Sequence, residues 1–221
     1  MKLSKTDINA IAKNDSNYLN TKGANCYLNK DYKTAVEYYR IASSMGNVQA
    51  ISNLGYCYLY GRDIEANTDL AIAYFEIAAQ RENVDACYKL GDIYGSDKWG
   101  KEDKELSIYY YRLAASILIS EDWENEAAIA YCSQLRQYPS LCFALARELM
   151  PGGYMRTDIV EAYQFLRVAE QGYRIELSNG ADFYQKTYED VISLLNDSIF
   201  DDIRDEIDLL FDDEDDSDER A

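Results

Sequence analysis

The 221-residue sequence contains no histidine, and this removes the side chain that most often acts as a general base near neutral pH. It also lacks a glycine-rich phosphate loop, a His-Glu-x-x-His pair and a Ser-x-x-Lys motif. The acidic stretch from Asp212 to Asp218 resembles a calcium loop only superficially, because it has neither the turn glycine nor the distal glutamate. We therefore expect no enzyme, no metal site and no cofactor.

Basic residues are scarce, since 22 Lys and Arg stand against 40 Asp and Glu and give a net charge of -18. They form no cluster of the kind that contacts phosphates, so direct nucleic-acid binding is not expected. A net charge of this size opposes compaction but favours solubility and the long-range attraction of basic molecules. The charge balance therefore indicates a basic protein as the partner.

The sequence shows neither a signal peptide nor a membrane-spanning run. Its first seven residues lack an apolar signal core, and no run of about 18 apolar residues occurs. The cysteines are odd in number and include no Cys-x-x-Cys pair: Cys26, Cys57, Cys87, Cys132 and Cys142. Such cysteines are typically small buried hydrophobic residues in a reducing compartment. We expect a cytoplasmic protein without membrane contact.

Only two prolines, Pro139 and Pro151, interrupt the chain, and Tyr, Ala and Leu recur at spacings of three and four residues. This short spacing is a helical period. A longer period is superimposed on it, because Ala35 lies 36 residues before Ala71, which lies 36 before Ser107. Each of these small residues is followed by aromatic residues and then by alanines, as expected for stacked helix pairs.

A glycine marks the first helix of each pair. Gly55 and Gly91 each lie sixteen residues before the corresponding small residue of the second helix, whereas Gly23 lies twelve residues before it. The extra four residues lengthen the loop between the helices. A fourth unit is displaced along the chain, with Leu145-Ala146 sixteen residues before Ala162.

The fold class that follows is all-α, an α/α solenoid or superhelix of about four antiparallel helix pairs with an inserted helix and C-terminal capping helices. We expect residues 1–15 to form an N-terminal capping segment, in which Ser4-x-x-Asp7 resembles a capping box. The repeat array spans 16–175 and contains an insertion at about 117–138, which carries Trp123. Capping helices follow over 176–211, and a disordered acidic tail over 212–221.

The sequence around residues 50–86 resembles the Sel-one-like repeat (SLR) family, a relative of the tetratricopeptide repeat with a longer loop between its helices. It reads Ala-x-x-x-Leu-Gly-x-x-Tyr-x-x-Gly, then Ala-x-x-Tyr-Phe-x-x-Ala-Ala, then Asn-Val-x-Ala. The shorter first unit resembles a tetratricopeptide repeat itself. The resemblance implies a right-handed stack of helix pairs that binds peptides or protein surfaces on its concave face.

Some secreted members of that family join each helix pair by a disulfide between cysteines eight residues apart. The corresponding positions here are Ala79 and Cys87, so this bridge cannot form, in agreement with a cytoplasmic protein.

The resemblance and the helical period divide the repeat residues by face. The residues interpreted as packing positions are Leu54, Gly55, Tyr58, Leu90, Gly91 and Tyr94. The candidate partner-binding residues, placed on the concave side of the first helices, are Ser52, Tyr56, Leu59, Asp85, Tyr88, Asp92, Phe143 and Arg147. Tyrosine suits such a surface because it offers a large area and a hydroxyl at a low entropic cost.

Two functional hypotheses remain open. The first is a cytoplasmic interaction module whose acidic, tyrosine-rich surface binds a basic protein, in one form an immunity or antitoxin-like protein that neutralises a toxin. The second is a regulatory scaffold that binds short peptide motifs in a signalling pathway. The acidic C-terminus can be a capping helix up to Phe211, a mimic of a polyanion, or an aid to solubility.

Overall fold

The computed structural model describes residues 2–119 and 127–218, with side chains described as far as Phe211. The chain divides into two compact units, Met1–Tyr110 and Tyr111–Ala221. Every regular element in the described residues is a helix, which confirms the all-α fold class.

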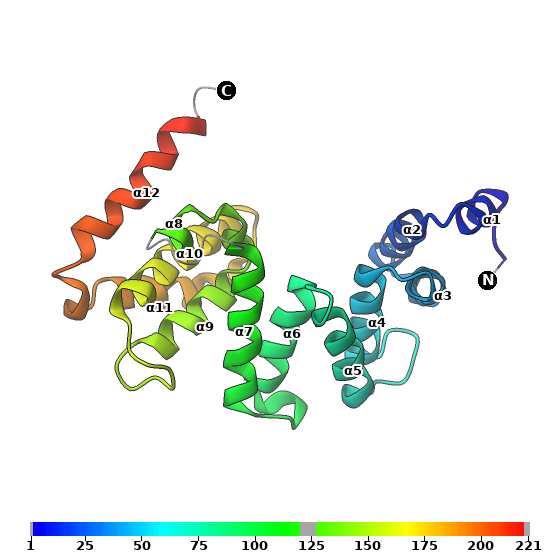
Figure 1. The fold of residues 1–221 in the computed structure, drawn as a ribbon, viewed down its shortest axis with the longest axis horizontal. Helices are drawn as coiled ribbons and strands as arrows, with labels where there is room; N and C mark the ends of the chain where they lie inside the picture. Colours follow the sequence, from blue (N-terminus) through cyan, green and yellow to red (C-terminus); the bar gives the residue numbers. More distant parts are fainter. Residues whose placement is uncertain (1, 120–126, 219–221) are drawn as a thin grey trace. The chain divides into compact units, whose positions relative to one another are not determined.

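The first unit is a series of helices joined by loops (Figure 1). It contains α1 (Lys5–Ala12), α2 (Ser16–Leu28), α3 (Tyr32–Ser44), α4 (Val48–Tyr60), α5 (Thr68–Ala79), α6 (Val84–Tyr94), the 3-10 turn η1 (Asp97–Trp99) and the first turns of α7 (Lys104–Ile119). The helices pack as consecutive pairs, α2 with α3 and α4 with α5, while α6 begins the third pair with α7. We call α2, α4 and α6 the first helices of these pairs, and α3, α5 and α7 the second helices.

The helix starts follow the 36-residue register. Asn47 and Asn83, at the starts of α4 and α6, accept backbone N–H groups at 2.8 and 2.9 Å. Asn67 and Asp103 cap α5 and α7 in the same way, at 2.9 and 3.0 Å. A side-chain oxygen at this position satisfies an N–H that the helix itself leaves unpaired. The repeating sequence therefore sets where each helix begins.

The glycine of the first helix lets an aromatic ring of the second helix lie against the helix backbone. A Cβ atom on Gly55 would lie 2.8 Å from the ring of Phe75, and one on Gly23 would lie 2.7 Å from the ring of Tyr39. Both rings are buried. Glycine is needed here because any side chain would push the two helices of the pair apart.

The tyrosines three residues after Gly55 and Gly91 stack on the second helices of their pairs. Tyr58 lies parallel to Tyr74, with ring centroids 5.3 Å apart, and Tyr94 lies parallel to Tyr110 at 5.8 Å. The second stack repeats the first after 36 residues. Aromatic contacts of this kind add about 0.5–1.5 kcal/mol beyond area burial. The Leu-Gly-x-x-Tyr motif is thus a packing motif, as the sequence predicts.

A buried carboxylate attaches α1 to the first pair. Asp7 is fully buried and accepts hydrogen bonds from Lys22 Nζ at 2.5 Å and Tyr38 Oη at 3.0 Å. Ser4 and Asp7 also form the expected capping box. Burial of the Asp7 carboxyl would raise its pKa, but hydrogen bonds from Lys22, Ser4 and Tyr38 hold that pKa well below its usual range. The charge is therefore retained inside the protein because it is paired.

The second unit is also a series of helices joined by loops (Figure 1). It contains the remainder of α7, α8 (Ala128–Tyr131), the turn η3 (Ser133–Gln137), α9 (Pro139–Leu149), α10 (Ile159–Ser178), the turn η4 (Asp182–Tyr184), α11 (Gln185–Leu195), the turn η5 (Ser198–Phe200) and α12 (Arg204–Asp218). The helix pair α9 and α10 is the displaced fourth repeat. The expected inserted helix corresponds to α8, which has only four residues, and Trp123 lies outside the described residues.

The C-terminal helices α11 and α12 pack against α10. Tyr163 of α10 contacts the buried ring of Phe200 at 5.0 Å, and its hydroxyl bonds to Asp208 Oδ1 at 3.1 Å. Asp208 also pairs with Arg167 at 3.0 Å. The helix α12 extends to Asp218, beyond the expected helix end at Phe211; the disorder of the acidic tail stays a prediction.

We expect Gly55→Ala to destabilise the first unit by about 1–3 kcal/mol, because the new methyl group meets the Phe75 ring. Urea unfolding followed by circular dichroism measures the change. Phe75→Leu removes the ring, so the double variant should lose less stability than the sum of the two single variants. Strict additivity would show that the close approach at Gly55 does not limit packing.

We expect Asp7→Asn to cost about 2 kcal/mol at pH 7, since it removes charged hydrogen bonds but leaves Lys22 able to reach water. The folded-state pKa of Asp7 is lowered, so its contribution is complete above the unfolded value of about 4 and is lost as the pH falls below it. The gap between wild type and variant should therefore narrow below about pH 4. The control Asp69→Asn, at an exposed ion pair, should leave the unfolding midpoint nearly unchanged. An equal gap at pH 3 and pH 7 would contradict this assignment.

Candidate partner-binding surface

The first helices of the first unit share one partly exposed face. The side chains of this first-helix face come from α2 (Asn17, Asn20, Thr21 and Ala24), α4 (Gln49, Asn53, Tyr56 and Tyr60) and α6 (Asp85, Tyr88, Lys89 and Asp92). Within each helix they recur every three or four residues, which puts them on one side. Gln49, Asn53 and Tyr56 lie 36 residues before Asp85, Lys89 and Asp92, so the face repeats in register although its chemistry changes.

Carboxamide pairs connect α2 and α4 along this face. Asn53 Nδ2 donates to Asn20 Oδ1 at 3.0 Å, and Asn47 Nδ2 donates to Asn17 Oδ1 at 2.8 Å. Each amide retains further donor and acceptor capacity after one such bond. The pairs therefore hold these polar groups in fixed orientations on the surface.

A second set of bonds connects α4 and α6. Asn83 Nδ2 donates to Gln49 Oε1 at 2.9 Å, and Gln49 Nε2 donates to Asp85 Oδ2 at 3.3 Å. Gln49 thus bridges the cap of α6 and a carboxylate of its first turn. The two helices hold each other's polar side chains in fixed orientations.

An aromatic row runs from the core of the first unit to its surface. The buried ring of Phe75 meets Tyr56 edge-on at 5.1 Å, and Tyr56 lies parallel to Tyr60 at 6.4 Å. Tyr60, which is 40% exposed, meets Trp99 of η1 edge-on at 5.7 Å. Rigid aromatic side chains with one exposed edge are the residues most often found at binding hot spots.

One ammonium group sits within this face. Lys89 Nζ lies 2.5 Å from Asp92 Oδ2, 5.8 Å from the Tyr56 ring centroid and 5.2 Å from that of Tyr88. Burial, together with the charges of Asp85 and Asp92, raises the pKa of Tyr56 far above its ordinary value. The Tyr56 hydroxyl is protonated at neutral pH, as tyrosine ordinarily is, and can donate a hydrogen bond.

Four of the predicted binding residues belong to this face: Tyr56, Asp85, Tyr88 and Asp92, all half-buried. The placement of Ser52 and Leu59 on an exposed surface is wrong, because both are buried. The helix α4 packs against both α3 and α5, which leaves it a narrower exposed strip than helical periodicity alone suggests. Neither side chain can meet a partner without a rearrangement of the core.

Phe143 and Arg147 belong to the second unit, on α9. The Arg147 side chain is exposed, and its guanidinium lies 5.8 Å from the centroid of the half-buried Phe143 ring. They lie one helical turn apart and form a small cation–π pair. Their role in partner binding stays a prediction.

Several residues of the face do not follow from the sequence reasoning. Tyr60, Lys89 and the carboxamide pairs are absent from the predicted set. Their shared signal is the 36-residue register, which relates Asn53 to Lys89 and Gln49 to Asp85. Trp99 had no such signal, because the loop that carries it departs from the repeat.

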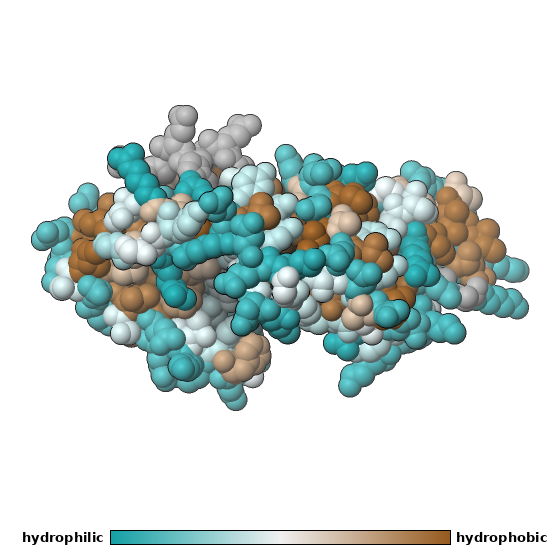
Figure 2. Space-filling view, turned by 90° about the horizontal axis from the view of Figure 1, so that it is seen from below, coloured by the Kyte–Doolittle hydropathy of each residue, from teal (hydrophilic) through white to brown (hydrophobic). Residues whose placement is uncertain are grey.

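Exposed hydrophobic side chains alone do not single out this face. The second helices of the first unit also expose large apolar residues, among them Leu70, Ile77 and Tyr109. Figure 2 shows hydrophobic surface between hydrophilic residues over both units. The first-helix face is distinguished instead by the bonds and stacks that hold its side chains in place.

The net charge is divided very unequally between the two units. Met1–Tyr110 contains 13 Lys and Arg against 15 Asp and Glu, a net charge of -2. Tyr111–Ala221 contains 9 against 25, a net charge of -16. The tyrosine-rich face therefore belongs to a nearly neutral unit, whereas the acidic character predicted from composition belongs to the other.

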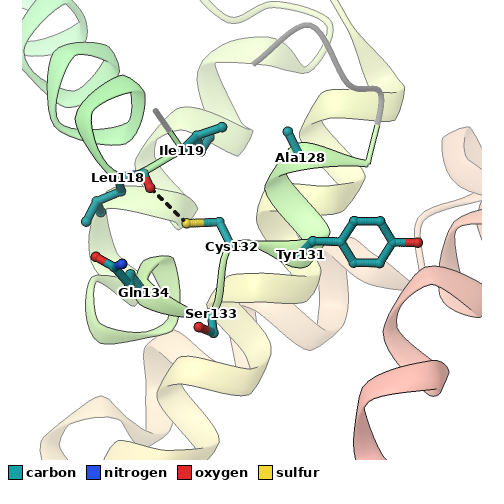
Figure 3. A pocket seen from close by; sticks show the side chains of 7 residues that line it. All are labelled: Leu118, Ile119, Ala128, Tyr131, Cys132, Ser133 and Gln134. Atoms are coloured by element: carbon teal, nitrogen blue, oxygen red, sulfur yellow. Dashed lines mark hydrogen bonds between the residues drawn. The ribbon is translucent and has the colours of Figure 1, made fainter. Parts of the chain in front are cut away.

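The second unit contains a hollow of about 250 Å³ (Figure 3). Its lining residues are Leu118, Ile119, Ala128, Tyr131, Cys132, Ser133 and Gln134. Cys132 Sγ lies 3.4 Å from the Leu118 carbonyl oxygen, to which it donates a hydrogen bond. None of these lining residues is charged, so they supply no acid–base pair, and we assign the hollow no chemistry.

The other thiols in the described residues are poor nucleophiles. All five cysteines are free, and Cys57, Cys87 and Cys142 are buried. Burial raises the pKa of Cys57 to about 12 and that of Cys87 to about 11, so both stay protonated.

Among the described residues, no group of three or more Cys, Asp or Glu side chains is placed to hold a metal ion. None of the described helices combines the length and hydrophobicity needed to span a bilayer.

Consecutive helix pairs, tight glycines and a repeating face define the class of protein: a helical-repeat protein. The Sel1 repeat profile matches residues 12–47, 48–83, 84–116 and 139–171. The chain therefore belongs to the Sel1 repeat family. The match to 12–47 shows that the first repeat, despite its shorter spacing, is a Sel1 repeat. The match to 139–171 confirms the displaced fourth repeat.

Solved structures with the same repeat are distant in sequence. A Sel1 repeat protein from Oxalobacter formigenes is 20% identical with a TM-score of 0.45, over 76% of this chain and 75% of that one. A protective antigen of uropathogenic Escherichia coli strains that displays an SLR fold is 17% identical with a TM-score of 0.44, over 76% of this chain and 43% of that one. No curated protein matches the chain.

Proposed function

We propose that the protein is an interaction module that binds a basic protein partner through its first-helix face. Sel1 repeat proteins generally mediate protein–protein interactions. The observation that carries the proposal is the order of the side chains on this face. Asn53 and Gln49 are each held by a hydrogen bond, and Tyr56 by an aromatic contact, to a residue of a neighbouring helix. Side chains that are already ordered lose little entropy when a partner binds.

The chemistry of the partner follows from charge at two ranges. At short range the face presents the carboxylates of Asp85 and Asp92 beside tyrosine rings. At long range the second unit contributes most of the charge of the chain, a net -16, which accelerates encounter with a basic protein. Aromatic contacts then hold the complex once it has formed.

One specific form of this function is an immunity protein, a cytoplasmic acidic protein that masks the basic surface of a toxin domain. The net charge of -18 on 221 residues supports this form. Such a protein acts by stoichiometric binding and needs no catalytic group. Its complex with the partner should dissociate as the salt concentration rises, because attraction over long distances is screened.

The near-neutral first unit favours a second form, a regulatory adaptor that binds a short peptide motif. Its net charge of -2 gives little long-range attraction, so recognition would depend on the ordered tyrosine and carboxamide side chains. Deletion of residues 212–221 removes a net charge of -6 and separates the two forms. The immunity form predicts slower association after this deletion, and the adaptor form predicts an unchanged rate.

The test of the binding face uses the immobilised chain to capture a partner from lysate of the source cell at low and moderate salt. We expect Tyr60→Ala to weaken binding of the captured partner at least tenfold, as for an aromatic hot spot. Tyr109→Ala is the matched control, because Tyr109 is equally a tyrosine and is 57% exposed but lies on a second helix. Equal losses for both variants, or a captured partner that is not basic, would contradict the proposal.

A further inference from the structure

The ammonium of Lys89 occupies a small cage on the first-helix face. Its walls are the rings of Tyr56 from α4 and Tyr88 from α6, and its base is the carboxylate of Asp92. We propose that this cage is a binding site for a cationic side chain, Arg or Lys, of the protein partner, and that Lys89 is its resident occupant until the partner displaces it. The inference rests on the proposed function and specifies how the face recognises a basic segment.

The cage has the chemistry of a cation site. Both ring centroids lie within 6 Å of Lys89 Nζ, the range in which the face of an aromatic ring attracts a cation. Asp92 Oδ2 adds a charged acceptor at 2.5 Å. The carboxylate of Asp85 also acts on Tyr56, so an anion that entered the cage would meet two like charges. The space between the two rings and Asp92 accommodates the ammonium group of Lys89.

The occupant is one that can leave. The Lys89 side chain is 14% exposed and that of Asp92 is 27% exposed, so the cage borders solvent. Lysine carries its charge on a flexible four-carbon stem that can extend into water without moving the helix. At the equivalent position of α4 stands Asn53, which is bonded to Asn20 instead. The lysine is therefore a feature of the third repeat and is not required by the fold.

An intramolecular occupant lowers the apparent affinity for an external one, because it is present at a high effective concentration. Removing the Lys89 ammonium should free the cage and tighten binding of a cation from outside. Removing the Asp92 charge should weaken it. A purely structural role for the Lys89–Asp92 pair predicts that neither change alters the affinity beyond the effect of its matched control.

The probe is a fluorescently labelled peptide with two arginines in a Gly/Ser background, and its binding to the full chain is followed by fluorescence polarisation. We expect Lys89→Gln to tighten binding about threefold relative to Lys101→Gln, which removes the same charge from an exposed ion pair in the same unit. We expect Asp92→Asn to weaken binding about threefold relative to the matched control Asp69→Asn. Thermal unfolding confirms that each variant is folded.

Equal affinities for Lys89→Gln and Lys101→Gln would overturn the proposal, since they would reduce the effect to net charge. Absence of binding by Lys89→Gln at millimolar peptide would also overturn it. Tighter binding of a glutamate version of the peptide by the wild type, lost in Lys89→Gln, would assign the site to an anion instead. None of these results touches partner capture by the whole face, which Tyr60→Ala tests separately.

Discussion

The close approach of the two helices within each repeat is the constraint on which the rest of the first unit depends. Gly55 leaves room for the Phe75 ring, and Tyr58 then stacks on Tyr74. These contacts fix the second helix against its first helix and leave only part of the surface of the first helix exposed. The first-helix face consists of the side chains of α2, α4 and α6 that this packing leaves partly exposed.

The same packing connects the core to the surface. Tyr56 touches the buried Phe75 on one side and Tyr60 on the other, so the proposed recognition surface is anchored in the core by one aromatic row. The face is ordered by its neighbours as well, through the carboxamide bonds of Asn53 and Gln49. Charge is distributed differently: the ordered face belongs to a unit of net charge -2, and the other unit carries -16. In the proposed function, short-range recognition and long-range attraction therefore reside in different parts of the chain.

The sequence predicts the repeat packing well because that packing is local and periodic. The 36-residue register predicts Gly55, Tyr58 and Tyr94 as packing positions, and the family match agrees with four repeats. It fails for Ser52 and Leu59, whose burial depends on how many neighbours surround α4. Contacts of this kind arise only when helices meet in space, and a single helical period does not contain them.

The cage around Lys89 could not be predicted from the sequence, because it too depends on how the helices pack. Asp92 is three residues from Lys89 and could be paired with it from spacing alone. The ring of Tyr56 comes from another helix, and its distance from Lys89 depends on the packing of α4 beside α6. The predicted limits of the capping segments and of the acidic tail stay predictions.

The central claim is that a protein partner binds the first helices of the first unit. The most direct test of this claim is amide hydrogen exchange of the full chain, measured with and without its captured partner. The account predicts that the partner slows exchange in α4 and α6, around residues 53–60 and 85–92, and leaves α5 at residues 68–79 unchanged. Slowed exchange confined to α5, or to the acidic α12, would contradict it.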